Sequence, residues 1–226
     1  MDQRKQTLLK LIIENHIQTA LPVGSEFLIE TSELEVSAAT VRNEMRDLEE
    51  AGFLTHPHTS AGRVPTEAGY RYYVANLMKV EEPAEVLTKK IVLVIRHAKD
   101  FTEKAKAIAR LFAGESGNAV IVAFNEKTVY YTGISNLFSQ PEFRDYARTV
   151  RISAIFDQCE ERMDDLYAAI DSDNPRVLVG RDNPLGDACS LIGTRLNKND
   201  LFAMLGPMRM DYGRGSGLLN YLQTVV

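Results

Sequence analysis

The feature that most constrains the fold is an amphipathic segment at residues 38–51, bounded by Ser37 and Gly52. Serine is a preferred residue immediately before a helix, and glycine commonly follows a helix end. At about 100° per residue, apolar side chains share one side of such a helix and polar ones the other. The apolar side carries Ala38, Val41, Met45 and Leu48, and the opposite side carries Ala39, Arg42, Asn43, Arg46 and Glu50. The segment predicts a helix with a buried stripe and a polar face bearing two arginines and an asparagine.

Two interpretations of this polar face are open from the helix alone. Arginine can pair bidentately with guanine and asparagine with adenine, so the face could read DNA. An ordinary amphipathic helix with solvated charges has the same pattern. The segments on either side of the helix favour the first interpretation.

These flanking segments have the order of a winged helix-turn-helix domain. Residues 2–20 predict a helix that has Asp2 near its N-cap position and ends at the break at 22–24. Ser25 is expected to cap a short second helix to about Ile29. After the central helix, 53–55 and 63–64 resemble short strands of a hairpin, and Thr66 is placed to cap a closing helix with Tyr70, Tyr73, Val74 and Leu77 on one face. We therefore expect a DNA-binding domain over residues 1–78. The candidate DNA contacts are Ser37, Thr40, Arg42, Asn43 and Arg46 at the recognition helix, and His58, Thr59, Ser60 and Arg63 in the wing.

Composition limits the other classes of protein. The net charge is −5, and residues 1–78 hold seven Lys/Arg against eleven Asp/Glu, which argues against a broad basic patch. Cys159 and Cys189 are too few and too far apart for a disulfide framework and predict two reduced, buried thiols. His56 and His58 have no clustered Cys or acid beside them, so no metal site and no cofactor are expected. The polar N-terminus and the short apolar run at 91–95 predict a cytoplasmic protein without a membrane segment.

Several stretches resemble the HrcA family of heat-shock repressors. They are Pro22-Val-Gly-Ser25, the run Ala39-Thr-Val-Arg-Asn-Glu-Met-Arg-Asp-Leu-Glu-Glu-Ala-Gly-Phe-Leu54, Pro57-His-Thr-Ser-Ala-Gly-Arg-Val-Pro65 and Gly69-Tyr-Arg-Tyr-Tyr73. Two later patches, 135–143 and 206–212, also match, with Met208 where the family usually has threonine. The resemblance implies a homodimeric repressor that binds an inverted-repeat operator and depends on the GroE chaperonin. It also implies a GAF-like fold for the C-terminal region, with no established ligand or catalytic residue. Between Val122 and Ser135 this sequence is much shorter than the family pattern, so it resembles a shortened member that lacks most of an inserted dimerising domain.

The second half predicts an α+β domain over 84–226, joined to the first by a linker at 79–83. The stretch 86–98 is ambiguous between strand and helix, and its position in the family favours a helix. Helices are expected at 102–113, from Pro141 to about Cys159 with Phe143, Ala147, Val150 and Ala154 aligned, at 160–170 and at 210–224. Strands are expected at 119–124, 128–132, 176–180, 188–194 and 201–205.

Three functions are conceivable for this second domain. An enzyme is not expected, because no Ser/His/acid set, P-loop or dinucleotide fingerprint is present; Gly213-Arg-Gly-Ser-Gly217 lacks the P-loop lysine and suggests a flexible helix start. Arg209 and Asp211 are expected to form a salt bridge or a cap that holds the last helix. A metabolite-sensing pocket lined by Arg181, Asp182 and Asn183 is the alternative to a plain assembly module for dimerisation and chaperonin docking.

Overall fold

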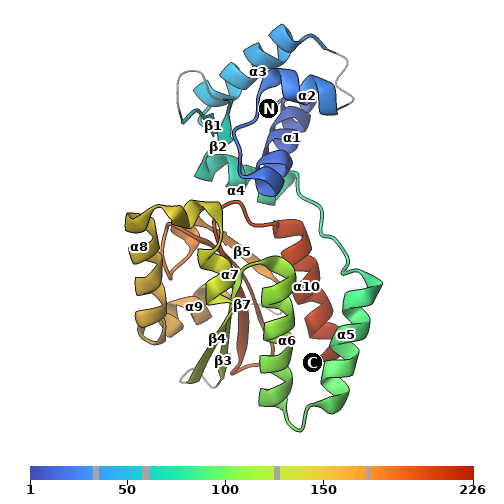
Figure 1. The fold of residues 1–226 in the computed structure, drawn as a ribbon, viewed down its shortest axis with the longest axis vertical. Coiled ribbons are helices and arrows are strands. Elements are labelled where there is room, and N and C mark those ends of the chain that lie inside the picture. The colour runs from blue at the N-terminus through green and yellow to red at the C-terminus, as the bar shows by residue number, and fades with distance from the viewer. Residues whose placement is uncertain (33–35, 58–61, 125–127, 172–173) are drawn as a thin grey trace. The chain divides into compact units, whose positions relative to one another are not determined.

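The computed structural model describes residues 1–32, 36–57, 62–124, 128–171 and 174–226. The chain divides into two compact units, Met1–Lys79 and Val80–Val226. Figure 1 draws both units as ribbons.

The first unit is built from helices and one small hairpin. Its elements are α1 (Gln3–Thr19), α2 (Ser25–Thr31), α3 (Ala38–Glu50), β1 (Leu54–Thr55), β2 (Val64–Pro65) and α4 (Glu67–Asn76). Side-chain caps start three of the helices: Asp2 accepts from the backbone N–H of Lys5, Ser37 from Thr40, and Thr66 from Gly69. These caps were predicted, because each satisfies backbone donors that a helix start leaves unpaired. The core consists of Leu8, Leu9, Ile12, Ile13, Val23, Leu28, Val41, Met45, Leu48, Leu54, Tyr70 and Tyr73.

The predicted cap at Ser25 is wrong by one residue. Gly24 occupies the cap position without a side-chain bond, and Ser25 is the first residue of α2 and is buried. The reason is that Val23 forms a bridge with Arg63, with both backbone N–H···O distances at 2.8 Å, so the chain stays extended until Gly24. A Cβ at Gly62 would overlap the backbone of Val23, which explains a glycine beside this bridge.

The second unit is a mixed helix and sheet domain, as predicted. Its five-stranded antiparallel sheet has the order β4-β3-β7-β6-β5. The strands are β3 (Ala119–Phe124), β4 (Thr128–Thr132), β5 (Arg176–Val179), β6 (Ser190–Arg195) and β7 (Leu201–Gly206). The helices are α5 (Glu85–His97), α6 (Phe101–Ser116), α7 (Ile134–Phe138), α8 (Tyr146–Asp157), α9 (Met163–Ala169) and α10 (Tyr212–Val225), with short 3-10 turns at Pro141–Arg144, Glu160–Arg162 and Gly180–Asp182.

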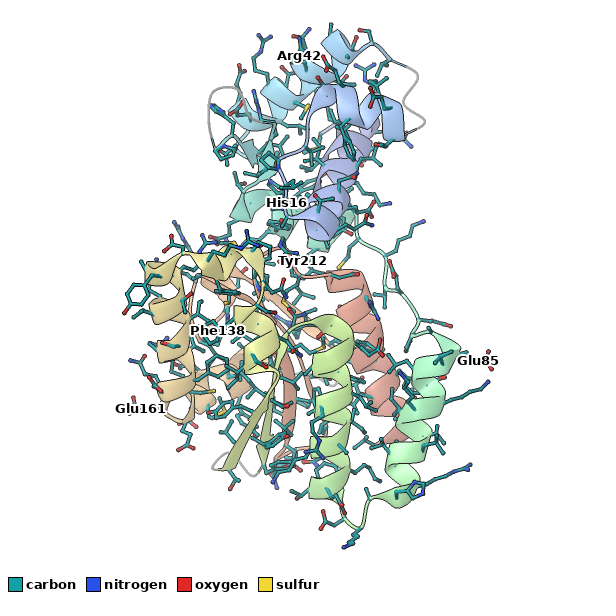
Figure 2. All side chains as sticks on the ribbon, in the orientation of Figure 1. His16, Arg42, Glu85, Phe138, Glu161 and Tyr212 are labelled. Atoms are coloured by element: carbon teal, nitrogen blue, oxygen red, sulfur yellow. The ribbon has the colours of Figure 1, made fainter. Side chains whose placement is uncertain are left out.

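Helices cover both faces of this sheet. On one face α6 contacts β3 and β4, α10 contacts β5 and β6, and Phe112 of α6 meets Phe202 of β7 edge to face at 5.5 Å. On the other face the side chains of Ile121, Leu191 and Ala203 belong to a buried cluster with residues of α7, α8 and α9. Phe138 of α7 joins this cluster through ring contacts with Phe143 and Phe156 (Figure 2).

The stretch 86–98 is helical in α5, as its position in the family favours. Two other sequence predictions for this unit need correction. The single helix expected from Pro141 to Cys159 is broken at Asp145, whose backbone is extended (φ −75°, ψ 115°) because its side chain caps α8. The aligned face predicted for that helix is wrong too, since Ala147 and Val150 are exposed while Ile152 and Ile155 are buried.

The glycine-rich run at 213–217 is a packing surface and not a flexible helix start. Gly213, Gly215 and Gly217 lie in α10 and are buried. A Cβ at Gly215 would overlap Ile192 of β6, and one at Gly217 would overlap the carbonyl oxygen of Glu81. The backbone N–H of Glu81 donates to the Gly213 oxygen (3.2 Å), so this part of the predicted linker lies directly against α10. The glycines allow this close approach of backbones.

Candidate nucleic-acid interface

Helix α3 has the two faces that its sequence predicts. Val41, Met45 and Leu48 are buried, whereas Arg42, Asn43 and Arg46 are exposed on the opposite side. The side chains of Arg42 and Arg46 are 66% and 63% exposed. Figure 2 labels Arg42 on this helix. The exposed side therefore offers two guanidinium groups and one amide from adjacent turns of a single rigid helix.

Among the residues that the structure describes, both exposed arginines have only weak partners. Arg42 lies 3.7 Å from Glu26 of α2, and Arg46 lies 3.9 Å from Glu50, one turn further along α3. All four side chains are largely exposed. Such pairs contribute little to stability, about 0–1 kcal/mol. A phosphate or a base edge could replace either acid at small cost.

Ser37 and Thr40 form a closed capping arrangement at the start of α3. The Ser37 hydroxyl accepts from the Thr40 N–H (3.1 Å), and the two hydroxyl oxygens are 2.9 Å apart. The N-terminal end of the helix carries partial positive charge, which suits a phosphate. The backbone N–H and the hydroxyl of Thr40 both contact the Ser37 hydroxyl in this cap.

Arg63 lies at the base of the hairpin and points to α3. Its Nε is 2.8 Å from Glu49 Oε2, and its side chain is only 22% exposed. His56, on the other arm of the hairpin, contacts Glu49 Oε1 through its Nδ1. Burial acts to raise the Glu49 pKa, but the hydrogen bond from His56 and the charge of Arg63 outweigh it and lower that pKa. Glu49 thus joins both arms of the hairpin to the helix.

Three of the predicted wing contacts, His58, Thr59 and Ser60, lie outside the described residues. In the described ranges, no group of three His, Cys, Asp or Glu side chains is arranged to hold a metal ion. Among those same residues, no helix is long and apolar enough to span a bilayer.

Sequence reasoning missed the acids that organise α3. Glu44 is buried and forms an ion pair with Arg4 of α1, and Asp47 lies 2.8 Å from Lys5. The hydrogen bond between Lys5 and Asp47 raises the lysine pKa and lowers that of the aspartate. The available signal was spacing, because Glu44 and Asp47 flank the apolar stripe of Val41, Met45 and Leu48. Together with Glu49, these carboxylates face partners inside the unit.

The polar groups singled out in the second unit serve structure. Arg209 forms a two-pronged ion pair with Glu142, closest at Nε, and also donates to Gln140 Oε1 (2.7 Å). Asp211 caps α10 by accepting from the Arg214 N–H at 3.0 Å. The predicted structural roles of Arg209 and Asp211 are confirmed.

The residues predicted to line a ligand pocket form a turn. The Asn183 amide is buried and donates to the carbonyl of Gly186 (3.1 Å), while its oxygen accepts from the Leu185 N–H (3.1 Å). Arg181 and Asp182 are exposed beside it. A half-open cleft of about 550 Å³ lies elsewhere, between residues 80–88 and α10, and none of the three lines it. This geometry does not favour the metabolite-sensing alternative.

Comparison with known proteins places this chain in a family. The family model described as the HrcA protein C terminal domain matches residues 79–215. The heat-inducible transcription repressor HrcA of Desulforudis audaxviator (strain MP104C) is 29% identical over 330 aligned positions, covering 98% of this chain and 96% of the relative. The protein of the same name from Chloroflexus aurantiacus is 58% identical over 79 residues, or 35% of this chain and 21% of the relative.

A crystal structure described only as that of a hypothetical protein has the same fold, with a TM-score of 0.70 at 16% identity over 100% of this chain and 98% of that one. The alignment of 330 positions to the Desulforudis protein exceeds the 226 residues of this chain, so the relative carries stretches without a counterpart here. Since the family model covers more than half of the sequence, this chain belongs to the HrcA family.

Proposed function

We propose that this protein is a heat-inducible transcription repressor that binds operator DNA through its first unit. One observation carries the proposal: α3 exposes Arg42, Asn43 and Arg46 opposite a buried stripe, and a hairpin follows it directly. Three helices, a hairpin and a closing helix correspond to a winged helix-turn-helix domain, with α3 as the recognition helix. The relatives in the family are heat-inducible transcription repressors, which supports the same role.

In this proposal α3 enters the major groove of double-stranded DNA. Arg42 and Arg46 pair with guanine or a phosphate, and Asn43 pairs with adenine. Ser37 and Thr40 at the helix start lie beside a phosphate. Residues 58–60 and Arg63 contact the backbone from the wing. Arg63 can do so only in part, because Glu49 neutralises it.

The acidic composition of the first unit is compatible with DNA binding. Glu44, Asp47 and Glu49 each have a cationic partner inside the unit, so their charges are compensated locally. The exposed side of α3 keeps two arginines whose acidic neighbours are solvent-exposed and easily displaced. The direction of the charges matters more to binding than their sum.

The second unit is proposed as a GAF-like assembly domain that brings two copies together. An inverted-repeat operator requires a homodimer, because its two half-sites are related by a two-fold axis. The resemblance to the family adds the GroE chaperonin as a proposed partner, and a repressor of this kind acts in the cytoplasm without catalysing a reaction. Neither a cofactor nor a membrane enters this role.

The test is fluorescence anisotropy on an inverted-repeat operator of the family and on a scrambled duplex, across a salt series. We expect tight binding to the repeat with two protomers per duplex, and weaker, strongly salt-dependent binding to the scrambled duplex. Equal and weak binding to both duplexes at every salt concentration contradicts the proposal. Replacing Asn43 by Ala serves as an internal check, since losing a base contact lowers affinity for the repeat and spares the scrambled duplex.

A further inference from the structure

Strand β4 is an edge of the five-stranded sheet, and no strand in the described part of the chain pairs with its outer side. In the described part of the chain, Thr128–Thr132 pairs with β3 alone, from Val120↔Thr132 to Phe124↔Thr128. An edge strand presents a row of unpaired backbone N–H and C=O groups to which another strand can add. The outer side of β4 is therefore open for pairing.

Side chains hold β4 firmly from both faces of the sheet. Tyr131 packs edge to face on Phe156 of α8, with ring centroids 5.7 Å apart. On the opposite face the Tyr130 hydroxyl accepts from Arg110 of α6 (3.1 Å), and the Lys106 ammonium lies 5.2 Å from the Tyr130 ring. A strand supported in this way keeps its extended shape and needs no reordering to accept a partner.

No residue of β4 protects this edge from pairing with another strand. Edge strands of sheets are commonly protected by charged residues, proline or a bulge. The sequence Thr-Val-Tyr-Tyr-Thr of β4 has no charged residue and no proline, and its strand propensity is high. The opposite edge differs, because β5 begins at Arg176, which is half-exposed and paired with Asp171 at 3.4 Å. The two edges of the sheet are thus unequal, and β4 is the unprotected one.

The sequence of β4 is complementary to itself in antiparallel pairing. A two-fold axis through Tyr130 sets Thr128 opposite Thr132, Val129 opposite Tyr131 and Tyr130 opposite Tyr130 of the other copy. Threonine pairs, aromatic pairs and aromatic–β-branched pairs are favourable across strands, and no like charges within the strand face each other. A two-fold interface requires this self-complementarity.

We propose that β4 pairs with β4 of a second copy of this chain, in antiparallel register about Tyr130, and joins the two sheets into one. The inference rests on the proposed function for its biological purpose, because a dimer is what an inverted repeat requires. The interface itself follows from the sheet order, the supported edge and the self-complementary strand. Pairing of the two β4 strands would be the contact through which the second unit assembles two copies.

The experiment compares two double variants of the full chain by sedimentation equilibrium without DNA. Thr128→Lys with Thr132→Lys sets like charges opposite each other twice, and we expect dimer affinity to fall about tenfold or more. Thr128→Lys with Thr132→Glu sets opposite charges at the same two positions, so its affinity should stay near or above that of the parent chain. The second variant controls for folding, because both change the same residues of one strand.

Cross-linking fixes the register independently. Oxidation of Tyr130→Cys should give a covalent dimer, since the two copies of this position face each other across the axis. Thr132→Cys should not, because its two copies would lie about 13 Å apart along the strands, beyond disulfide reach. Cys159 and Cys189 are buried and contribute little background.

A monomeric parent chain at tens of micromolar overturns the proposal. A dimer that responds equally to both charge variants, or that cross-links no better at Tyr130→Cys than at Thr132→Cys, overturns it as well. Operator binding is measured separately, so failure of DNA recognition with a charge-dependent dimer would count against the proposed function and leave this interface standing.

Discussion

Replacing Arg46 by Ala removes one guanidinium from the exposed side of α3 and little else. The side chain is 63% exposed, and its partner Glu50, 73% exposed, is 3.9 Å away one turn along the same helix. An exposed pair of this spacing contributes about 0.3–0.5 kcal/mol. Alanine is also a good helix former. The free energy of unfolding should therefore change by less than about 0.5 kcal/mol.

The effect on DNA binding should be larger. A bidentate contact from Arg46 to guanine corresponds to about 1–3 kcal/mol, so affinity for the operator should fall roughly 5- to 150-fold. A phosphate contact instead weakens binding to repeat and scrambled duplexes equally and reduces the salt slope by about one. The assay is fluorescence anisotropy on both duplexes at several salt concentrations, with urea unfolding of the same samples.

Arg151→Ala is the matched control, because Arg151 is 67% exposed and forms a surface ion pair at 2.9 Å with Asp187 in the second unit. It should leave operator affinity unchanged. If Arg46→Ala binds the operator as tightly as the parent chain at fixed salt, Arg46 is not part of the interface. If it unfolds more easily by over about 1 kcal/mol, the reasoning from exposure is wrong.

The remaining predictions concern stability. Ser37→Ala should destabilise the first unit by about 1 kcal/mol in urea unfolding, because the cap on α3 is lost; no change would mean that Thr40 replaces it. Gly217→Ala should lower the melting temperature, since the new Cβ meets backbone, whereas Gly114→Ala in α6 has open space and should raise stability by about 0.5–1 kcal/mol. Equal shifts for the two glycines would contradict the packing account. The lowered pKa of Glu49 means that its ionisation favours the folded state above its ordinary pKa of 4.5 and that this contribution is lost as pH falls through the folded pKa. Replacing Glu49 by Gln should therefore reduce the loss of unfolding free energy at acidic pH. If the dependence of the unfolding free energy on pH is unchanged, Glu49 does not contribute to it.

Local signals in the sequence predicted much of the first unit. The caps at Asp2, Ser37 and Thr66 form as expected, because each bond spans only three residues. The exposed and buried faces of α3 were also predictable, because helical periodicity depends only on residues within about two turns of one another. Recognition of the family came from contiguous motifs, which need no tertiary information.

Tertiary structure decided which charges and backbones meet. Glu44 contacts Arg4, 40 residues away in sequence, and Glu49 contacts His56 and Arg63 on the two arms of the hairpin. Composition alone could not show that these acids of α3 are paired with cations inside the unit. The glycines at 213–217 are typical of a flexible segment in sequence, but β6 and residue 81 pack against them in the fold. The sheet order, which places β4 at an open edge, depends on pairing β3 with β7 some 80 residues away. Such contacts are set by burial and shape across the whole unit, and no local pattern encodes them.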